Sequence, residues 1–326
     1  MPASLREWSH RLEVAAAQPA RTAELPLWTE MLRRQDPPLG PRPLDPLRDV
    51  VGTAASTSLS LPARWTAPLL TTVPAAFNAT VDDVLLTGLA LAVADWRRTR
   101  GGGAQSAVLV DLEGHGREDV FDGVDLSRTV GWFTTLTPVR LDVGALDWNE
   151  VWAAGPAVGH ALRRVKELLR RLPDGGLGYG MLRYLNADTG RALDGLARPQ
   201  VGFNYLGRFP AAREAADAHD FGLVAGLPGP AVRDPGSPLA HAIEVNAVTA
   251  DGAGGPLLSA RWSWPRALYG DAGLDDLADT WFRALEVLVL HAERPDAGGH
   301  TPSDLSLGSL GQDEIDELEA ELRESR

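Results

Sequence analysis

The chain has 326 residues, of which 44% are hydrophobic, so it can bury a large core in one unit or in two domains of moderate size. Acidic residues outnumber basic ones by 44 to 31, and the resulting net charge of -13 argues against a nucleic-acid partner, which needs clustered positive charge. The sequence contains no cysteine, which excludes disulfides, thiolate metal sites and a cysteine nucleophile. Since no apolar run is long enough for a signal peptide or a membrane span, we expect a cytoplasmic protein.

The first 50 residues are predicted to form a small helical segment followed by a linker. Ser4 is placed to cap a first helix, and Glu7, three residues later, completes the pattern of a capping box. A second helix is predicted over residues 23–34, and the prolines between residues 37 and 46 then make an irregular connector. We therefore expect residues 1–50 to be an inter-lobe segment and residues 51–326 to be the main body.

The main body alternates predicted strands and helices. Strands are predicted over residues 54–61, 108–112, 136–141, 200–206, 243–249 and 257–264, and helices over residues 81–98, 148–172, 274–292 and 312–323. A glycine-rich turn between the last two strands is typical of a hairpin. The expected class is α/β, a two-layer sandwich with a mixed sheet and flanking helices.

Other parts of the sequence give weaker indications. We assign the basic residues of the helix over 148–172 to a solvated face: Arg163, Arg164, Lys166, Arg170 and Arg171. The weakly periodic segment between residues 210 and 239 is interpreted as a mobile or substrate-facing loop whose role stays open. No glycine-rich phosphate loop of the common spacings occurs, so we expect no nucleotide cofactor, and we assign no metal ligands.

The most informative stretch follows the strand at residues 108–112. Residues 112–118 read LEGHGRE, which puts Glu113 at the end of an apolar strand, ahead of a turn made flexible by Gly114 and Gly116. A carboxylate in such a place is either a catalytic group facing a cavity or one half of a surface ion pair. His115 is either an assistant to Glu113 or a structural hydrogen-bond partner, and Arg117 either contacts substrate or holds the loop.

Four motifs in order carry a resemblance to a known family. They are LEGHGRE at residues 112–118, DLSRTVGWFT at 125–134, PDGGLGYG at 173–180 and VGFNYLG at 201–207. From about residue 4 to residue 304 the sequence resembles the epimerization domains of nonribosomal peptide synthetases, a subtype of the condensation-domain superfamily. Condensation domains proper usually carry Phe-Val-Asn where this chain has WFT at 132–134, which favours the epimerization subtype.

The resemblance implies a fold of chloramphenicol-acetyltransferase type with two lobes, and a reaction that inverts the α-carbon of an aminoacyl or peptidyl thioester. The thioester is held on the 4'-phosphopantetheine arm of a partner carrier protein, so no cofactor is expected on the chain itself. Glu113 matches the catalytic carboxylate of the family, and Tyr205 matches a pocket tyrosine, although such a phenol can equally be a core ring with a satisfied hydroxyl. Asn204 and Trp132 are candidate substrate-binding residues, with core packing as the alternative for Trp132.

The family's front lobe ends in an HHxxxDG motif, and this sequence contains no two adjacent histidines. We therefore interpret the chain as the rear lobe of an epimerization domain, inactive alone because proton exchange needs groups on both sides of the α-carbon. The partners implied are a carrier protein, the missing front lobe and neighbouring synthetase domains, with self-association through an exposed apolar lobe face. Two alternatives remain, a non-catalytic module that docks a carrier protein and a fragment of a peptide-bond-forming condensation domain.

Overall fold

The computed structural model describes residues 3–101, 105–210, 234–270, 273–305 and 310–324. Its six-stranded sheet is made of β1 (Ala54–Leu61), β2 (Ala107–Gly114), β3 (Thr135–Asp142), β4 (Val201–Phe209), β5 (Ile243–Gly252) and β6 (Gly255–Pro265). The strand order is β1-β6-β5-β4-β2-β3. Strand β4 is parallel to both β2 and β5, whereas the other neighbouring pairs are antiparallel. The sheet is therefore mixed, as predicted.

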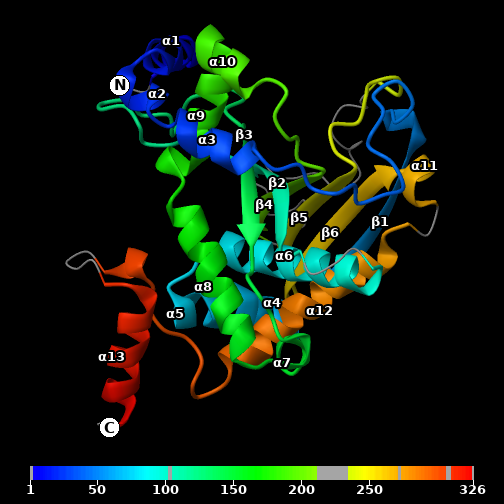
Figure 1. Cartoon of the computed structure of the whole chain (residues 1–326), viewed down its shortest axis with the longest axis vertical. Coiled ribbons are helices and arrows are strands. Elements are labelled where there is room, and N and C mark those ends of the chain that lie inside the picture. The colour runs from blue at the N-terminus through cyan, green and yellow to red at the C-terminus, as the bar shows by residue number, and fades with distance from the viewer. Residues whose placement is uncertain (1–2, 102–104, 211–233, 271–272, 306–309, 325–326) are drawn as a thin grey trace.

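Helices surround this sheet along its edges and on one of its faces (Figure 1). The N-terminal part holds α1 (Leu5–Ala16), α2 (Pro19–Thr22) and α3 (Leu25–Leu32), and the middle holds α4 (Ala63–Leu70), α5 (Thr72–Phe77), α6 (Val81–Thr99), α7 (Trp148–Trp152), α8 (Pro156–Arg170), α9 (Leu177–Gly180) and α10 (Ala187–Leu193). The remainder are α11 (Arg266–Tyr269), α12 (Asp275–Ala292) and α13 (Gln312–Glu324). Short 3₁₀ turns cover Val51–Thr53, Pro173–Gly176 and Pro302–Asp304, and Met181–Leu185 is a π-helical turn.

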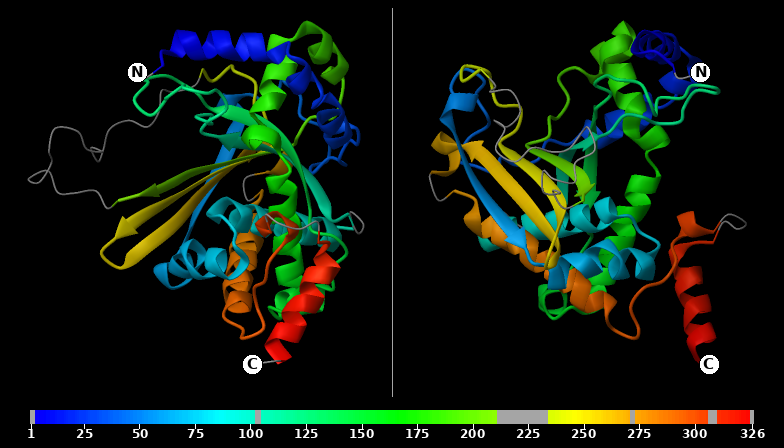
Figure 2. Two further views of the ribbon diagram at one scale, coloured as in Figure 1. Left: turned by 90° about the vertical axis from the view of Figure 1, so that its left-hand side faces the viewer. Right: turned by 180° about the vertical axis from the view of Figure 1, so that it is seen from behind.

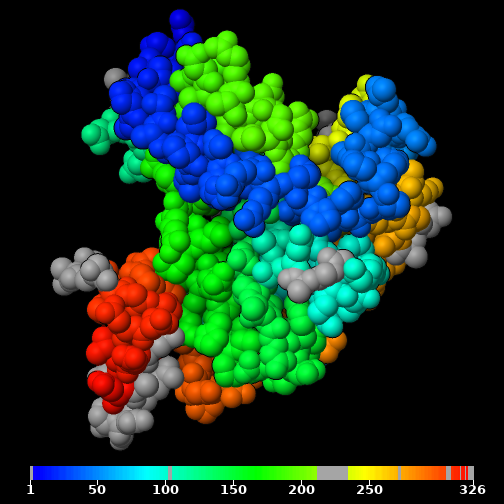
Figure 3. Space-filling model, in the orientation of Figure 1, coloured from blue at the N-terminus to red at the C-terminus, as the bar shows by residue number. Residues whose placement is uncertain are grey.

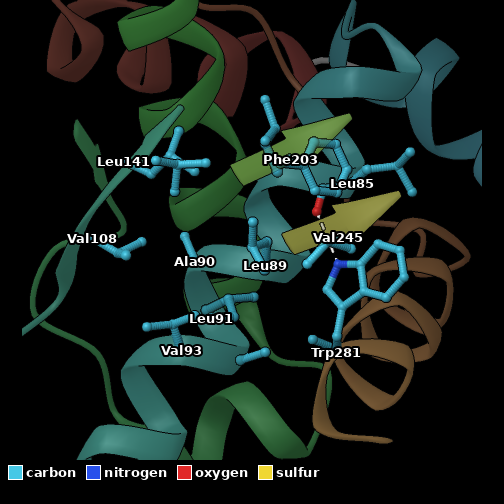
Figure 4. Close-up of a cluster of buried hydrophobic side chains, with 14 of the residues drawn as sticks. Leu85, Leu89, Ala90, Leu91, Val93, Val108, Leu141, Phe203, Val245 and Trp281 are labelled. Atoms are coloured by element: carbon cyan, nitrogen blue, oxygen red, sulfur yellow. Dashed lines mark hydrogen bonds between the residues drawn. The ribbon is translucent and has the colours of Figure 1, made fainter. Parts of the chain in front are cut away.

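The main core lies between the sheet and the pair α6 and α12, which cross beneath it (Figures 1 and 2). In Figure 4, Leu89 of α6, Phe203 of β4 and Val245 of β5 converge on Trp281 of α12. The indole of Trp281 also donates a hydrogen bond of 3.1 Å to the carbonyl oxygen of Leu85. These contacts bury one face of the sheet. The other face packs against α3 at its β2–β3 end, where Arg140 donates a hydrogen bond to the Met31 carbonyl oxygen, and it is open over β1, where Ser56, Ser58 and Ser60 are exposed.

The segment 1–50 takes part in two cores. Trp28 and Leu32 of α3 are almost fully buried in the main core. Trp8 of α1 instead packs with Phe133 and Met181 in a second, smaller cluster. Figure 3 shows the N-terminal segment lying directly against α10 and its neighbours. The N-terminal helices are thus integral to the packing, and the proposed boundary at residue 50 does not coincide with a gap between cores.

Several predicted elements are confirmed and others are corrected. Strand β1 has the predicted bounds, and β5 and β6 form the expected hairpin. The predicted helix over 148–172 is wrong as one element, because Ala154 has a φ of +55° and Pro156 begins a new helix, α8. The predicted helix over 23–34 is likewise shorter, with α3 covering Leu25–Leu32. The short helices α4 and α5 were not predicted.

Two local predictions also need correction. Ser4 caps α1 by accepting a hydrogen bond of 3.1 Å from the Glu7 amide, but the Glu7 carboxylate pairs with Arg11 at 2.8 Å and does not complete the capping box. Lys166 is not on a solvated face. Its side chain is 0% exposed, with the ammonium 2.6 Å from a carboxylate oxygen of Asp304 and 2.8 Å from the Phe77 carbonyl oxygen. The mobile or substrate-facing loop predicted between residues 210 and 239 falls largely outside the described residues.

Candidate functional site

The site is built by the register of three adjacent parallel strands. Glu113 of β2 lies opposite Asn204 of β4, which in turn lies opposite Asn246 of β5. Since side chains alternate between the two faces of a strand, these three side chains share a face. The same face carries the exposed serines Ser56, Ser58 and Ser60 of β1 further across the sheet, so it is the partly open, polar face.

Glu113 sits in a small polar pocket on this face. The pocket has a volume of about 20 Å³, which is room for about one water molecule. Its lining residues are Asp111, Glu113, Leu136, Gly202, Phe203, Asn204, His241, Glu244, Val245 and Asn246. Burial and, to a smaller extent, the negative charge of Glu244 raise the pKa of the Glu113 carboxyl, while the charge of His241 acts in the opposite direction. A raised pKa suits a carboxyl group that exchanges protons near neutral pH.

Asn204, the candidate substrate-binding residue on β4, lies beside Glu113, since the two residues pair across β2 and β4. Its side-chain amide donates a long hydrogen bond of 3.4 Å to the Asn246 side chain. Tyr205, the next residue, points to the opposite face, where it packs against the main core and donates a hydrogen bond of 3.0 Å to the Thr249 hydroxyl. Burial raises the pKa of Tyr205. The structure therefore does not bring the Tyr205 phenol to Glu113.

The other candidates on the LEGHGRE turn face away from the pocket. His115 has a side chain 71% exposed, and its Nδ1 atom accepts a hydrogen bond of 3.0 Å from the Arg117 amide. The Arg117 guanidinium donates to the carbonyl oxygens of Leu126 and Thr129 and lies 4.2 Å from the centre of the Phe133 ring. Arg117 thus holds the loop, through backbone carbonyls and a ring contact.

The two glycines of the turn are explained by close packing. Gly116 has a φ of +64°, and a Cβ atom there would lie 1.7 Å from the carbonyl oxygen of Phe133. A Cβ atom on Gly114 would lie 2.9 Å from the Thr135 hydroxyl. Gly116 is therefore needed because the backbone of Phe133 packs directly against it. Trp132, one residue before Phe133, is 84% exposed and does not line the pocket, so its side chain is not packed in the core.

Sequence reasoning missed the residues that surround Glu113. Asp111, two residues earlier on β2, points to the same face, and its carboxylate lies 2.9 Å from Nε2 of His241. The alternation of strand residues could have indicated Asp111. His241 and Glu244 are more than 100 residues away in the sequence, and it is the parallel pairing of β4 with both β2 and β5 that brings them here.

A larger cavity of about 800 Å³ lies elsewhere, between α3, α8 and α13, and contains none of the predicted site residues. Within the described ranges, no group of three or more His, Asp or Glu side chains is arranged to hold a metal ion.

No single described helix is long and apolar enough to cross a membrane. The pair Ala63–Phe77 and Val81–Thr99, bent by 99°, meets the requirement for a span by length and composition only.

Comparison with known proteins assigns the family. The condensation-domain family model matches residues 2–304, so the chain belongs to the condensation-domain family of nonribosomal peptide synthetases. One of the linear gramicidin synthase proteins of Brevibacillus parabrevis is 34% identical over 324 residues, which are 97% of this chain and 6% of that protein. Chondramide synthase of Chondromyces crocatus is 33% identical over 327 residues, covering 96% of this chain and 7% of that protein. The chain thus spans only a small part of these relatives.

Solved structures narrow the comparison. The epimerization domain from the third module of tyrocidine synthetase B superposes with a TM-score of 0.72 and 28% identity, over 90% of this chain and 60% of that one. The X-domain from teicoplanin biosynthesis superposes with a TM-score of 0.53 and 20% identity, over 92% of this chain and 61% of that one. The second likeness concerns the fold alone. The predicted fold class, that of the condensation and epimerization domains, is confirmed.

Proposed function

We propose that this chain is one lobe of an epimerization domain and contributes to the L-to-D inversion of an aminoacyl or peptidyl thioester. The observation that carries the proposal is the similarity to the tyrocidine synthetase epimerization domain, which has higher identity and a higher TM-score than the X-domain. The WFT sequence at residues 132–134 supports the same subtype. The substrate would arrive on the phosphopantetheine arm of a carrier-protein domain, so the chain itself would hold no cofactor.

In this proposal Glu113 exchanges the proton on one side of the α-carbon. The carboxyl group stands on the partly open sheet face and has a raised pKa, which supports a role as a proton carrier. Removal of the Cα proton leaves an enolate of the thioester, and delivery of a proton to the opposite side of the α-carbon gives the D-isomer. The group on that side would come from the HHxxxDG motif of a front lobe facing this sheet. Asn204, beside Glu113, is placed to orient the thioester.

The partly open face would then be the face that meets the front lobe. Its described side chains are largely polar, with the serines of β1, Arg261 of β6 and the asparagines of β4 and β5. Such a surface favours a hydrated channel through which an acyl chain and its pantetheine arm pass. The same face also carries exposed leucines, such as Leu136 opposite Glu113 and Leu257 on β6, and self-association through an exposed apolar lobe face stays a prediction.

The test is Cα hydrogen exchange in D₂O. An L-aminoacyl thioester on a carrier protein would be incubated with this chain alone, with a separately expressed front lobe, and with both. We expect deuterium at the α-carbon only when both are present. No exchange by both together, under conditions in which an intact epimerization domain exchanges, would rule the proposal out. Exchange by this chain alone would mean that both proton carriers lie within it.

A second candidate follows from the family model, which covers condensation domains as a whole. A condensation domain joins a donor acyl group to an acceptor amine, so it would form a peptide from two loaded carrier proteins. Product analysis of the two-lobe assembly with donor and acceptor carriers separates the two. A peptide product without α-carbon inversion would favour condensation, and neither product together with measurable carrier binding would favour a non-catalytic docking module.

A further inference from the structure

His241 is a buried histidine that lines the same pocket as Glu113 and that no motif singled out. Its side chain is 8% exposed, and Nε2 lies 2.9 Å from a carboxylate oxygen of Asp111. The other ring nitrogen, Nδ1, is buried and has no hydrogen-bond partner within the described part of the chain. A buried polar atom left without a partner is costly, so its retention needs an explanation beyond packing.

The backbone of β4 is shaped to admit this ring. Gly202 lies opposite Asp111 on one side and Glu244 on the other, on the same sheet face as Glu113. A Cβ atom at Gly202 would lie 2.5 Å from Nδ1 of His241 and 2.8 Å from its Cε1 atom. The imidazole therefore rests directly on the glycine, in space that any other residue would fill. Without that space the ring could not reach Asp111.

The charges around the pocket explain what such a ring can do. Three carboxyl groups line it, Asp111 and Glu113 from β2 and Glu244 from β5, whereas β3 contributes only the apolar Leu136 and β4 only uncharged residues. Carboxylates gathered in a desolvated pocket disfavour one another's ionisation. Among the pocket-lining residues His241 is the single group that can carry positive charge.

We propose that His241, held in place by Asp111 over Gly202, is a positioning residue that favours the ionised form of Glu113 in the pocket that both residues line. The imidazole does not contact the substrate, because its Nε2 atom is committed to Asp111 and its Nδ1 atom faces the strand. It acts through Glu113, whose pKa its charge lowers against the opposing effects of burial and Glu244. The catalytic consequence rests on the proposed function, whereas the effect on Glu113 does not.

The first experiment follows Glu113 directly, without any enzymatic activity. The chain is labelled with ¹³C at the glutamate side-chain carboxyls, and the Glu113 signal is identified by its disappearance in Glu113→Gln. Its titration midpoint is then measured in the unmodified chain, in His241→Gln and in Gly202→Ala. The control is His10→Gln, which removes a histidine that is 74% exposed on α1.

We expect His241→Gln to move the Glu113 midpoint to higher pH, because the carboxyl group loses the imidazole whose interaction lowers its pKa. Gly202→Ala is expected to shift it in the same direction, since the added methyl displaces the ring from Asp111. His10→Gln should leave it unchanged. An unchanged midpoint in a folded His241→Gln chain overturns the proposal. If that variant does not fold, an unchanged midpoint in Gly202→Ala overturns it equally.

The second experiment repeats the Cα exchange assay across pH with the two-lobe assembly. His241→Gln should shift the acidic limb of the exchange rate to higher pH and leave the plateau at higher pH in place, whereas a merely structural role would lower the whole profile. Exchange with an identical pH profile in both proteins would refute the proposed role of His241 while leaving the proposed function standing. No exchange by the unmodified assembly would refute the proposed function and leave the titration result intact.

Discussion

Replacing Lys166 with methionine tests whether the Lys166 ammonium group is part of a buried ion pair with Asp304 and not of a solvated face. Methionine keeps the length of the side chain but removes the ammonium group, which leaves the Asp304 carboxylate and the Phe77 carbonyl oxygen without their donor. Breaking a buried ion pair by removing one partner costs about 3–5 kcal/mol. Because the Asp304 side chain keeps 13% exposure and a hydrogen bond from the Thr301 amide, we expect a loss of about 3 kcal/mol.

The loss should depend on pH. Burial raises the pKa of Asp304, but hydrogen bonds from Lys166 and the Thr301 amide outweigh it and hold the pKa below its usual value. A carboxyl group with a lowered pKa in the folded state contributes stability above its unfolded pKa and loses that contribution as the pH falls through the folded pKa. The difference in the free energy of unfolding between the unmodified protein and Lys166→Met should therefore be largest at neutral pH and decrease below about pH 4.

The assay is urea denaturation of both proteins at neutral and acidic pH. Arg164→Met is the matched control, since it breaks an ion pair from the same helix to Asp142 in which the side chains are 55% and 37% exposed. Such an exposed pair is worth about 0–1 kcal/mol. The reasoning would be refuted if Lys166→Met destabilised the protein no more than Arg164→Met does.

Three further results are expected. In thermal unfolding, Gly116→Ala should lower the stability by about 2 kcal/mol or more, because the new methyl group overlaps the Phe133 carbonyl oxygen. The control Gly195→Ala, at a similar φ of +75° but with open space around it, should cost about 1 kcal/mol. Equal losses would contradict the role given to Gly116. Glu113→Gln should slow Cα exchange by about 10²- to 10⁴-fold, and a loss below tenfold would remove Glu113 from the mechanism. Glu113→Gln should also raise the free energy of unfolding at neutral pH relative to acidic pH. The reason is that a carboxyl group whose pKa is raised in the folded state loses its contribution to stability as the pH rises through that pKa. A gain in the free energy of unfolding that did not depend on pH would contradict this.

Elements with a strong local pattern could be predicted from the sequence. The long helix α6 begins after Thr80, whose side chain accepts a hydrogen bond from the Asp83 amide as a helix cap should, and its apolar residues then fill the core. Strand β1 alternates as expected between a buried and an open face. Interruptions were harder to predict, because the break between α7 and α8 depends on the positive φ of Ala154 as well as on Pro156.

Only some of the residues of the site could be predicted from the sequence. Glu113 could be found because a carboxylate ends an apolar strand before a glycine turn, and Asn204 because it lies in a family motif. Tyr205 lies in the same motif, but strand alternation turns it to the core face. His241 could not be found, since its place beside Asp111 is set by pairing between distant strands and by the missing side chain of Gly202.

Lys166 illustrates the same limit for charged residues. Its position among arginines on an amphipathic helix is typical of a solvated face, and nothing local marks it as buried. The turn at Pro302–Asp304, far along the chain, supplies the carboxylate that makes its burial tolerable.

The most direct test of the central claim is chiral analysis of an L-aminoacyl thioester on a carrier protein after incubation in D₂O with the two-lobe assembly, in parallel for the unmodified chain and Glu113→Gln. We expect D-isomer carrying deuterium at the α-carbon with the unmodified chain and almost none with Glu113→Gln. D-isomer formed equally by both proteins would contradict the role of Glu113. Retention of the L-isomer by both, alongside an active intact epimerization domain, would contradict the proposed function itself.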